Sequence, residues 1–449
     1  MKVTGNMTKS PAEINQLFSK DALRQSWLDV EAALSEVQGE MQIIPQEAAL
    51  EISKKAHLKY LDSEELTREI KRTKAPIVSL TKQLAAACEK DHGRYVHWGA
   101  TTQNIIQTGR ILQIRKAHQL MRKEFGEVLA ALIHLAEKGN MMVMAGRTQR
   151  RQALPITFGF KVAGWMDEFL RHLERFDQFE PRFFCLQFGG AIGAMQSFGK
   201  DGSEISKRLG KKLNLTHLPV PVRSANDFLA EYVSTMALYG TTCSKVAQEL
   251  YTLMADEFGE VAEGMGKDVI GSSTMPQKIN SKVACNIITV AARIRSQIFL
   301  AFEGMHSSHE GDAATNKMMS EALDTVCKAA YELTLDMKSL INELQLKPEA
   351  MRQNLDKTNG LIVAENIMMT LAPVLGRQKA HDLLHHAAEV SVSGEKTLAE
   401  ILKSDPAVSA NISHEKLDEA LDPANYLGDS IKITEETIAR VKEVLPKLA

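Results

Sequence analysis

The densest set of reactive side chains in the sequence lies in the ten-residue string Gly271–Asn280, GSSTMPQKIN. Ser272 and Ser273 stand six and five residues before Lys278. A hydroxyl can act as a base only where backbone N–H groups and a nearby cation stabilise its alkoxide, and a Gly-Ser-Ser turn followed by a lysine can supply both. Proton abstraction by a serine is one interpretation of this string. A helix-capping turn is the other, because such tripeptides are common in turns.

A second polar string, His97–Asn104, reads HWGATTQN. Its short hydroxyl and amide side chains could hydrogen-bond a carboxylate at the mouth of a helix without adding charge, but they could equally form an N-cap. These side chains belong to Thr101, Thr102, Gln103 and Asn104. Imidazoles titrate near neutrality, so the candidates for a proton donor are His97, His306 and His309.

The third string, Gly146–Pro155, reads GRTQRRQALP and contains Arg147, Arg150 and Arg151. If these arginines face inward they form a dense anion site, and if they face outward they form a solvated basic turn. Thr148 and Gln149 lie between them. Glutamine carries no proton at neutral pH, so Gln149 can orient or polarise a substrate but cannot be the general acid.

Together these strings resemble the signature segments of the fumarase/aspartase superfamily. GSSTMPQKIN matches its GSSxMPxKxN loop, and GRTQRRQALP matches its GRTHxQxAxP segment with Gln149 in place of the histidine. The resemblance implies that Ser272 is the base that takes the Cβ proton, with Ser273 as its neighbour. It further implies substrate contacts by Lys278, Met275, Asn280, Thr101, Thr102, Gln103, Asn104, Arg147, Thr148 and Gln149. Arg151 departs from the pattern and would favour an extra substrate carboxylate.

HWGATTQN is similar to the HWGATSQD segment of the branch that contains 3-carboxy-cis,cis-muconate cycloisomerase and adenylosuccinate lyase, with Asn104 where an aspartate is usual. Adenylosuccinate lyases usually carry a T-x-H-D-V segment and an H-E-R-D-type segment. Here the first place, Thr73–Val78, lacks the histidine, and the second, His309–Asp312, has Gly311 instead of the arginine. Because that arginine serves the nucleotide phosphate, these differences argue against a purine nucleotide substrate.

Composition excludes several other classes of protein. The 449 residues carry a formal net charge of −2, which gives no bulk attraction to nucleic acid or to an anionic membrane. There is no run of about eighteen apolar residues and no apolar core of a signal peptide. The five cysteines are widely spaced without a C-x-x-C pair. We therefore expect a cytoplasmic protein with free buried thiols, no metal site and no cofactor.

The elements that must position the three strings are helices. Apolar residues recur at three- and four-residue steps, which predicts an all-α fold. The main runs span 15–40, 111–138, 156–179, 227–261 and 282–305. Helices of this length predict a bundle that completes its core by oligomerising. We predict an N-terminal helical domain over 1–108, a central bundle over 109–358 and a small C-terminal domain over 359–449. The resemblance implies a homotetramer in which three subunits build each active site.

The functional hypothesis is a lyase that eliminates an amine or oxygen group from a succinyl-type di- or tricarboxylate and releases fumarate or a related unsaturated acid. An aci-carboxylate intermediate would carry the developing charge. Cycloisomerisation of 3-carboxy-cis,cis-muconate is the alternative, and adenylosuccinate lyase is disfavoured by the missing histidine and arginine. A hypothesis of another class is a non-catalytic structural protein built on this scaffold.

Overall fold

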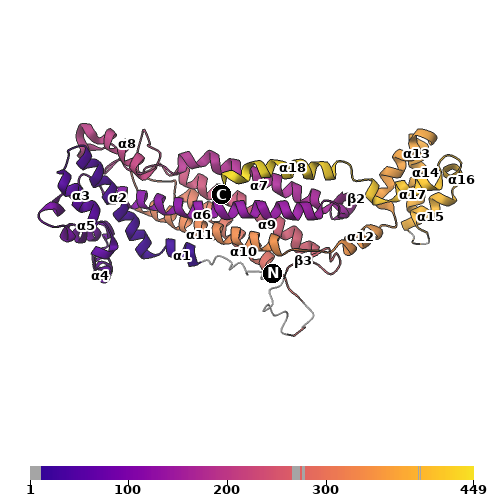
Figure 1. The fold of residues 1–449 in the computed structure, drawn as a ribbon, viewed down its shortest axis with the longest axis horizontal. Coiled ribbons are helices and arrows are strands. Elements are labelled where there is room, and N and C mark those ends of the chain that lie inside the picture. Colours follow the sequence, from indigo (N-terminus) through magenta and orange to yellow (C-terminus); the bar gives the residue numbers. More distant parts are fainter. Residues whose placement is uncertain (1–11, 265–273, 276–278, 393, 395, 449) are drawn as a thin grey trace. The chain divides into compact units, whose positions relative to one another are not determined.

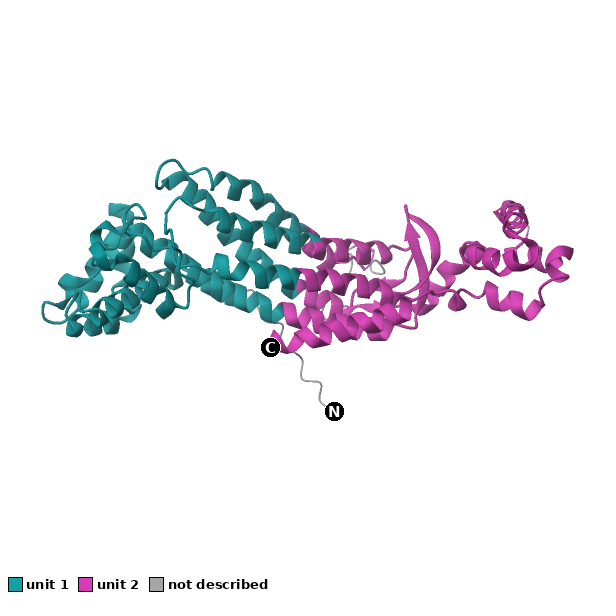
Figure 2. Ribbon diagram, turned by 90° about the horizontal axis from the view of Figure 1, so that it is seen from above, with its two compact units in different colours: residues 1–124, 172–241, 289–335 teal, residues 125–171, 242–288, 336–449 magenta. Residues whose placement is uncertain are grey.

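The fold is almost entirely helical (Figure 1), as the apolar periodicity predicted. The computed structural model describes residues 12–264, 274–275, 279–392, 394 and 396–448. The chain folds into two compact units (Figure 2), each assembled from three separate stretches of sequence. Unit 1 comprises 1–124, 172–241 and 289–335, and unit 2 comprises 125–171, 242–288 and 336–449. The predicted three-domain division stays a prediction.

Five long helices contribute residues to both units: α6 (Thr102–Gly139), α7 (Phe158–Phe183), α9 (Asp227–Leu253), α10 (Val283–Glu303) and α11 (Ala313–Glu343). The other helices of unit 1 are α1 (Ala12–Leu17), α2 (Lys20–Glu40), α3 (Gln46–Lys55), α4 (Ser63–Thr73), α5 (Pro76–Ala87) and α8 (Gly202–Leu213). Those of unit 2 are α12 (Pro348–Asp356), α13 (Ala364–Leu375), α14 (Arg377–Val392), α15 (Leu398–Ser404), α16 (Pro406–Ser409), α17 (His414–Leu421) and α18 (Ser430–Val444). Short 3₁₀ turns occur at Leu58–Tyr60, His92–Tyr95, Gln196–Asp201, Leu361–Val363, Pro423–Asn425 and Leu445–Lys447.

Two small antiparallel strand pairs are present where the sequence analysis expected no strands. Strands β1 (Val143–Thr148) and β2 (Arg151–Thr157) form a hairpin, and β3 (Val261–Ala262) pairs with β4 (Gln345–Leu346). Burial along β1 and β2 does not alternate strictly, and the register shifts between Ala145 and Arg147. An interrupted period of two leaves little signal in the sequence. Helix α11 also had no predicted counterpart.

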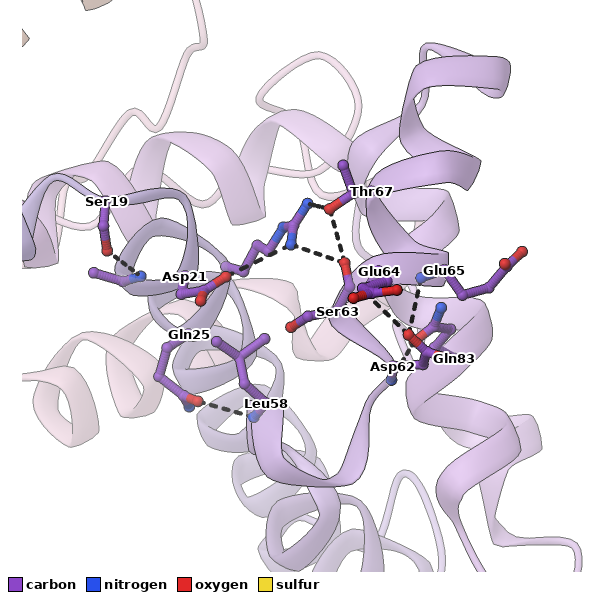
Figure 3. Close-up of polar contacts among 12 residues, drawn as sticks. Ser19, Asp21, Gln25, Leu58, Asp62, Ser63, Glu64, Glu65, Thr67 and Gln83 are labelled. Carbon is purple, nitrogen blue, oxygen red and sulfur yellow. Dashed lines mark hydrogen bonds and ion pairs between the residues drawn. The ribbon is translucent and has the colours of Figure 1, made fainter.

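The N-terminal helices of unit 1 are fixed by side-chain caps and cross-helix hydrogen bonds (Figure 3). Asp62 caps α4 by accepting from the backbone N–H groups of Glu64 and Glu65 at 3.0 and 2.9 Å. Arg24 of α2 donates to the Thr67 hydroxyl of α4 at 2.7 Å. These contacts hold α2, which carries part of the candidate site described below.

Aromatic side chains from α6, α7 and α9 fill part of the core of unit 1. The fully buried His118 packs against the rings of Phe176, Phe179 and Tyr232. Burial lowers the pKa of His118, and its hydrogen bond to Glu180 at 3.1 Å only partly offsets this effect. A buried neutral imidazole of this kind is a core residue rather than a catalytic one.

Helix α10 is apolar over its length. By length and composition alone it is long enough to cross a membrane, and α12 together with Leu361–Leu375 would be a second such stretch, although that pair is bent by 83°. Arg293 and Arg295 interrupt the apolar run of α10, and Arg293 pairs with Glu332 at 2.5 Å. Helices that pack against other helices pass the same test, so it does not identify a membrane span.

Candidate functional site

The string Gly271–Asn280, called the serine loop below, is flanked by segments that the carboxylate of Glu263 joins. Ser272, Ser273 and Lys278 lie outside the described residues, whereas Met275 and Asn280 are described and exposed. Before the loop, the carboxylate of Glu263 accepts hydrogen bonds from the backbone N–H groups of Lys282 and Ala284, both at 2.9 Å, and from the hydroxyl of Ser281.

This carboxylate caps the N-terminus of α10, where a negative charge is favourable. A cap supplied from eighteen residues upstream of Ser281 leaves no local pattern in the sequence. It joins the residue before the loop directly to the residues after it.

The string Gly146–Pro155 lies at the tip of the β1–β2 hairpin, called the Gln149 hairpin below. Gln149 and Arg150 are the two central residues of the turn and have φ of 49° and 64°. Positive φ at both positions is the geometry of a type I′ turn, which favours glycine or asparagine, so two bulkier side chains there are strained. Thr148, Gln149, Arg150 and Arg151 are all exposed. Strained residues often lie at functional sites, where other contacts enforce their conformation.

Arg147, two residues before the turn, is held by contacts with other segments. Its guanidinium makes a bidentate pair with the fully buried Glu260, with Nη2 at 2.6 Å from Oε1 and Nη1 at 3.0 Å from Oε2. It also stacks over the ring of Phe258 at 4.8 Å. The amide of Asn354 donates to Glu260 Oε1 at 2.7 Å, and Gln152 of β2 donates to the Asn354 carbonyl at 2.7 Å.

The Arg147–Glu260 pair therefore ties the hairpin to the segment that leads into the serine loop, since Glu260 lies three residues before Glu263. A direct contact between Arg147 and substrate stays a prediction. In this structure both Nη atoms of Arg147 donate to Glu260.

In unit 1 the string His97–Asn104, called the Thr101 string below, leads into α6. Its last residue, Asn104, shows why an amide suits this position. Asn104 is fully buried. Its Oδ1 accepts from the backbone N–H of Thr101 at 3.3 Å, and its Nδ2 donates to the carbonyl of Gly190 at 3.3 Å. An aspartate could not donate to that carbonyl. Asn104 thus joins the start of α6 to the glycine-rich turn at 188–195, while Thr101, Thr102 and Gln103 remain half-buried.

His97 is oriented by a buried carboxylate that the sequence analysis did not single out. Its Nδ1 lies 2.6 Å from Oε1 of Glu31, and Glu31 is almost completely buried on α2. A carboxylate on one ring nitrogen fixes the imidazole orientation and its tautomer. The only signal for Glu31 in the sequence is its position on the apolar face of the 15–40 run. Among the described residues no carboxylate holds His306 or His309 in this way, so His97 is the candidate proton donor that we carry forward.

A small hollow in unit 1 adjoins the Thr101 string. Its polar lining residues come from α6, α11 and the residue before α9: Gln103, Gln107, Arg110, Asn226, Asn316 and Ser320. Apolar side chains, among them Ile106, Leu229 and Met319, line much of the rest. Oδ1 of Asn226 is buried there with no hydrogen-bond partner in the described part of the chain. Its Nδ2 donates to the carbonyl of Gly304 at 3.1 Å.

Three of the cysteines are poorly suited to act as nucleophiles. None of the five forms a disulfide. Burial raises the pKa of the Cys327 thiol to about 12 and those of Cys88 and Cys185 to about 11. Thiols with such pKa values stay protonated at neutral pH. Among the residues that the structure describes, no three His, Cys, Asp or Glu side chains are grouped to hold a metal ion.

Comparisons with known proteins agree with the strings discussed above. A family model described as Lyase matches residues 5–296, and one described as Adenylosuccinate lyase C-terminus matches residues 360–437. The N-acetyl-S-(2-succino)cysteine lyase of Enterococcus italicus is 34% identical over 430 residues, which are 96% of this chain and 94% of that protein. The adenylosuccinate lyase of Methanothermobacter thermautotrophicus is 34% identical over 435 residues, 95% of this chain and 96% of that protein.

Among solved structures, the 3-carboxy-cis,cis-muconate lactonizing enzyme from Pseudomonas putida superposes with a TM-score of 0.90 at 30% identity, covering 97% of this chain and 98% of that one. The similarity to enzymes of one superfamily therefore extends over nearly the whole chain. The chain is a lyase of the fumarase/aspartase superfamily, with the all-α fold of that superfamily.

Proposed function

We propose that this lyase removes a β substituent from a succinyl-type di- or tricarboxylate and releases fumarate or a related unsaturated acid. The observation that carries the proposal is the buried Arg147–Glu260 pair, which fixes the Gln149 hairpin against the segment leading into the serine loop. A base and a polarising amide must each be held firmly, whichever subunit supplies them to a given site. No cofactor takes part in the proposed chemistry.

In the proposed reaction Ser272 takes the proton from the carbon α to one carboxylate, and the electron pair moves into that carboxylate. Lys278, Asn280 and the Thr101–Thr102 hydroxyls hold the resulting aci-carboxylate, because donors placed where charge develops lower the barrier most. The electron pair then forms the double bond as the β substituent departs. Gln149 polarises the substrate, and His97, oriented by Glu31, supplies a proton to the leaving group.

The leaving group we favour is a thiol. The sequence analysis considered C–N and C–O bonds, but the relative from Enterococcus italicus is named for a succinylated cysteine, in which the bond is C–S. A thiol has an ordinary pKa near 8.5, so a thiolate departs with little help from a general acid. A thiol leaving group therefore suits a site in which position 149 is a glutamine, which cannot act as a general acid.

The proposed active unit is a homotetramer with sites shared between subunits. Large apolar side chains lie exposed on the helices of unit 1, including Phe299 at 74%, Phe302 at 52% and Leu238 at 53%. Large apolar side chains exposed on long helices are typical of an interaction surface when they adjoin one another. Burying such faces between copies would complete the core of the bundle.

The test is turnover of matched succinyl compounds by the purified full chain. S-(2-succino)-N-acetylcysteine, an N-(2-succino) amine and malate are each offered while the absorbance of fumarate is followed. We expect fumarate from the thioether, and we expect Ser272→Ala to lower kcat by about 10³-fold, within the range that one general base contributes. Undiminished activity of that variant would place the base elsewhere.

A second candidate function is cycloisomerisation of 3-carboxy-cis,cis-muconate, which the structural likeness to the Pseudomonas putida enzyme favours. It uses the same proton chemistry in the addition direction. Loss of the muconate absorbance, without fumarate from any succinyl compound, would support it. Adenylosuccinate tests the disfavoured third candidate, and inactivity on every substrate would support the non-catalytic hypothesis.

A further inference from the structure

Arg223 lies in the segment between α8 and α9 and is anchored to the same glycine-rich turn as Asn104. Its Nη1 donates to the carbonyl of Ala191, whereas Asn104 donates to the carbonyl of the preceding residue, Gly190. Gln107 of α6 donates to the Arg223 carbonyl at 3.5 Å. The guanidinium is therefore fixed beside the start of α6, in the same unit as Thr101, Thr102 and Gln103.

Gly311 leaves room for this guanidinium. A Cβ atom at position 311 would lie 3.2 Å from Nη2 and 3.3 Å from Cζ of Arg223. Contacts this short would force the guanidinium to shift. The string His309–Asp312 has no arginine of its own, and the space beside its glycine holds an arginine from another part of the chain.

The charge of Arg223 is not compensated within the described part of the protein. No described carboxylate pairs with it, and its Nε is buried without a hydrogen-bond partner. Burial lowers the pKa of Arg223, and no neighbouring acid counters that effect. Arginine nevertheless stays protonated. Burying part of a cation and leaving one of its N–H donors without a partner costs free energy unless an anion binds there.

Other arginines of the chain have partners that compensate the charge of the guanidinium. Arg147 has Glu260, and Arg110 has Asp324. Arg115 also lacks an acid, but it donates to the carbonyls of Leu213 and Asn214 at the C-terminus of α8, where the helix dipole is negative. The guanidinium of Arg223, in contrast, donates to a single carbonyl, that of Ala191, which does not lie at the C-terminus of a helix.

We propose that Arg223 binds a carboxylate of the substrate beyond the two of its succinyl part, and so selects tricarboxylates. This inference rests on the proposed function, because it assigns the extra carboxylate to the leaving group. A succinylated N-acylcysteine has three carboxylates, two on the succinyl part and one on the cysteine. Arg223 is a specificity-determining residue in this view, and the bond that breaks is unchanged.

Ligand binding tests the proposal without any turnover. Calorimetry with the full chain would compare succinate, which has two carboxylates, with propane-1,2,3-tricarboxylate, which has three. We expect the wild-type chain to prefer the tricarboxylate. Arg223→Gln should weaken that ligand by about 10- to 100-fold, as expected for a lost hydrogen bond to a charged group, and change succinate binding less than about twofold.

Two further variants separate recognition from support of the fold. Gly311→Ala should weaken the tricarboxylate selectively, because it displaces the guanidinium while Arg223 is retained. Arg208→Gln removes an exposed arginine of α8 that pairs with Glu204, and it should change neither affinity. Equal weakening of both ligands by Arg223→Gln would assign it a structural role only, and no preference of the wild-type chain for the tricarboxylate would overturn the proposal.

Kinetics then distinguish this inference from the proposed function. The ratio of kcat/KM for S-(2-succino)-N-acetylcysteine to that for S-(2-succino)-N-acetylcysteamine, which lacks the third carboxylate, should fall by about 10- to 100-fold in Arg223→Gln. If the wild-type chain eliminates neither thiol, the proposed function fails while the binding result stands. If it eliminates both with a ratio that Arg223→Gln leaves unchanged, the inference fails alone.

Discussion

At the scale of single residues, the site depends on acidic side chains that the sequence strings did not reveal. Glu260 pairs with Arg147, and Glu31 orients His97. Each acid lies far from its partner in sequence, so only the folded chain brings the pair together. The basic and hydroxyl residues could be found from their clustering, whereas the carboxylates that position them could not.

We predict that Glu260→Gln destabilises unit 2 strongly. The substitution keeps the shape of the side chain but leaves the charge of Arg147 without its buried partner, and breaking a buried pair costs about 3–5 kcal/mol. The expected result is a lower guanidinium midpoint of unfolding. Arg147→Met with Glu260→Leu is the matched control, since it removes both charges and should recover much of the loss. A Glu260→Gln midpoint within error of the wild type would contradict a stabilising role for the pair.

At the scale of elements, the long helices were predictable and the hairpin was not. The runs 111–138, 156–179, 227–261 and 282–305 correspond to α6, α7, α9 and α10, because a buried helical face repeats over many turns. The predicted ends differ where other contacts intervene. Ile156 pairs with Met144 in the hairpin, which delays α7 to Phe158, and Val261 pairs with Leu346 in β3–β4.

The hairpin turn yields a prediction about strain. Arg150 has φ of 64°, a conformation that costs a residue with a side chain about 1–2 kcal/mol and costs glycine little. Arg150→Gly should therefore stabilise the protein by about 0.5–1 kcal/mol, after allowing for the greater freedom of glycine in the unfolded chain. Arg151→Gly, in the first residue of β2, is the control and should destabilise. Thermal unfolding of both variants would measure the difference, and a lower midpoint for Arg150→Gly would argue against strain at the turn.

At the scale of the whole molecule, the question is what covers the apolar face of α10. Within the apolar window of that helix, 28% is buried, and Phe299 is 74% exposed. Leaving such a surface in water is unfavourable by about 25 cal/mol per Å² of apolar area, so a partner surface is expected. A second copy of this chain is the partner that our proposed function requires, because a symmetric assembly buries the same face on every subunit.

We therefore predict that Phe299→Glu breaks the assembly and lowers activity together with it, since a charge placed in an apolar interface must be desolvated without a partner. Light scattering during gel filtration would show a species smaller than the wild-type oligomer. Val392→Glu is the matched control, because Val392 is 75% exposed on α14 and lies away from the long helices in sequence. It should leave the mass unchanged. A Phe299→Glu chain that keeps the wild-type mass and turnover would show that this face of α10 is not the interface, and the shared active site would then need support from another surface.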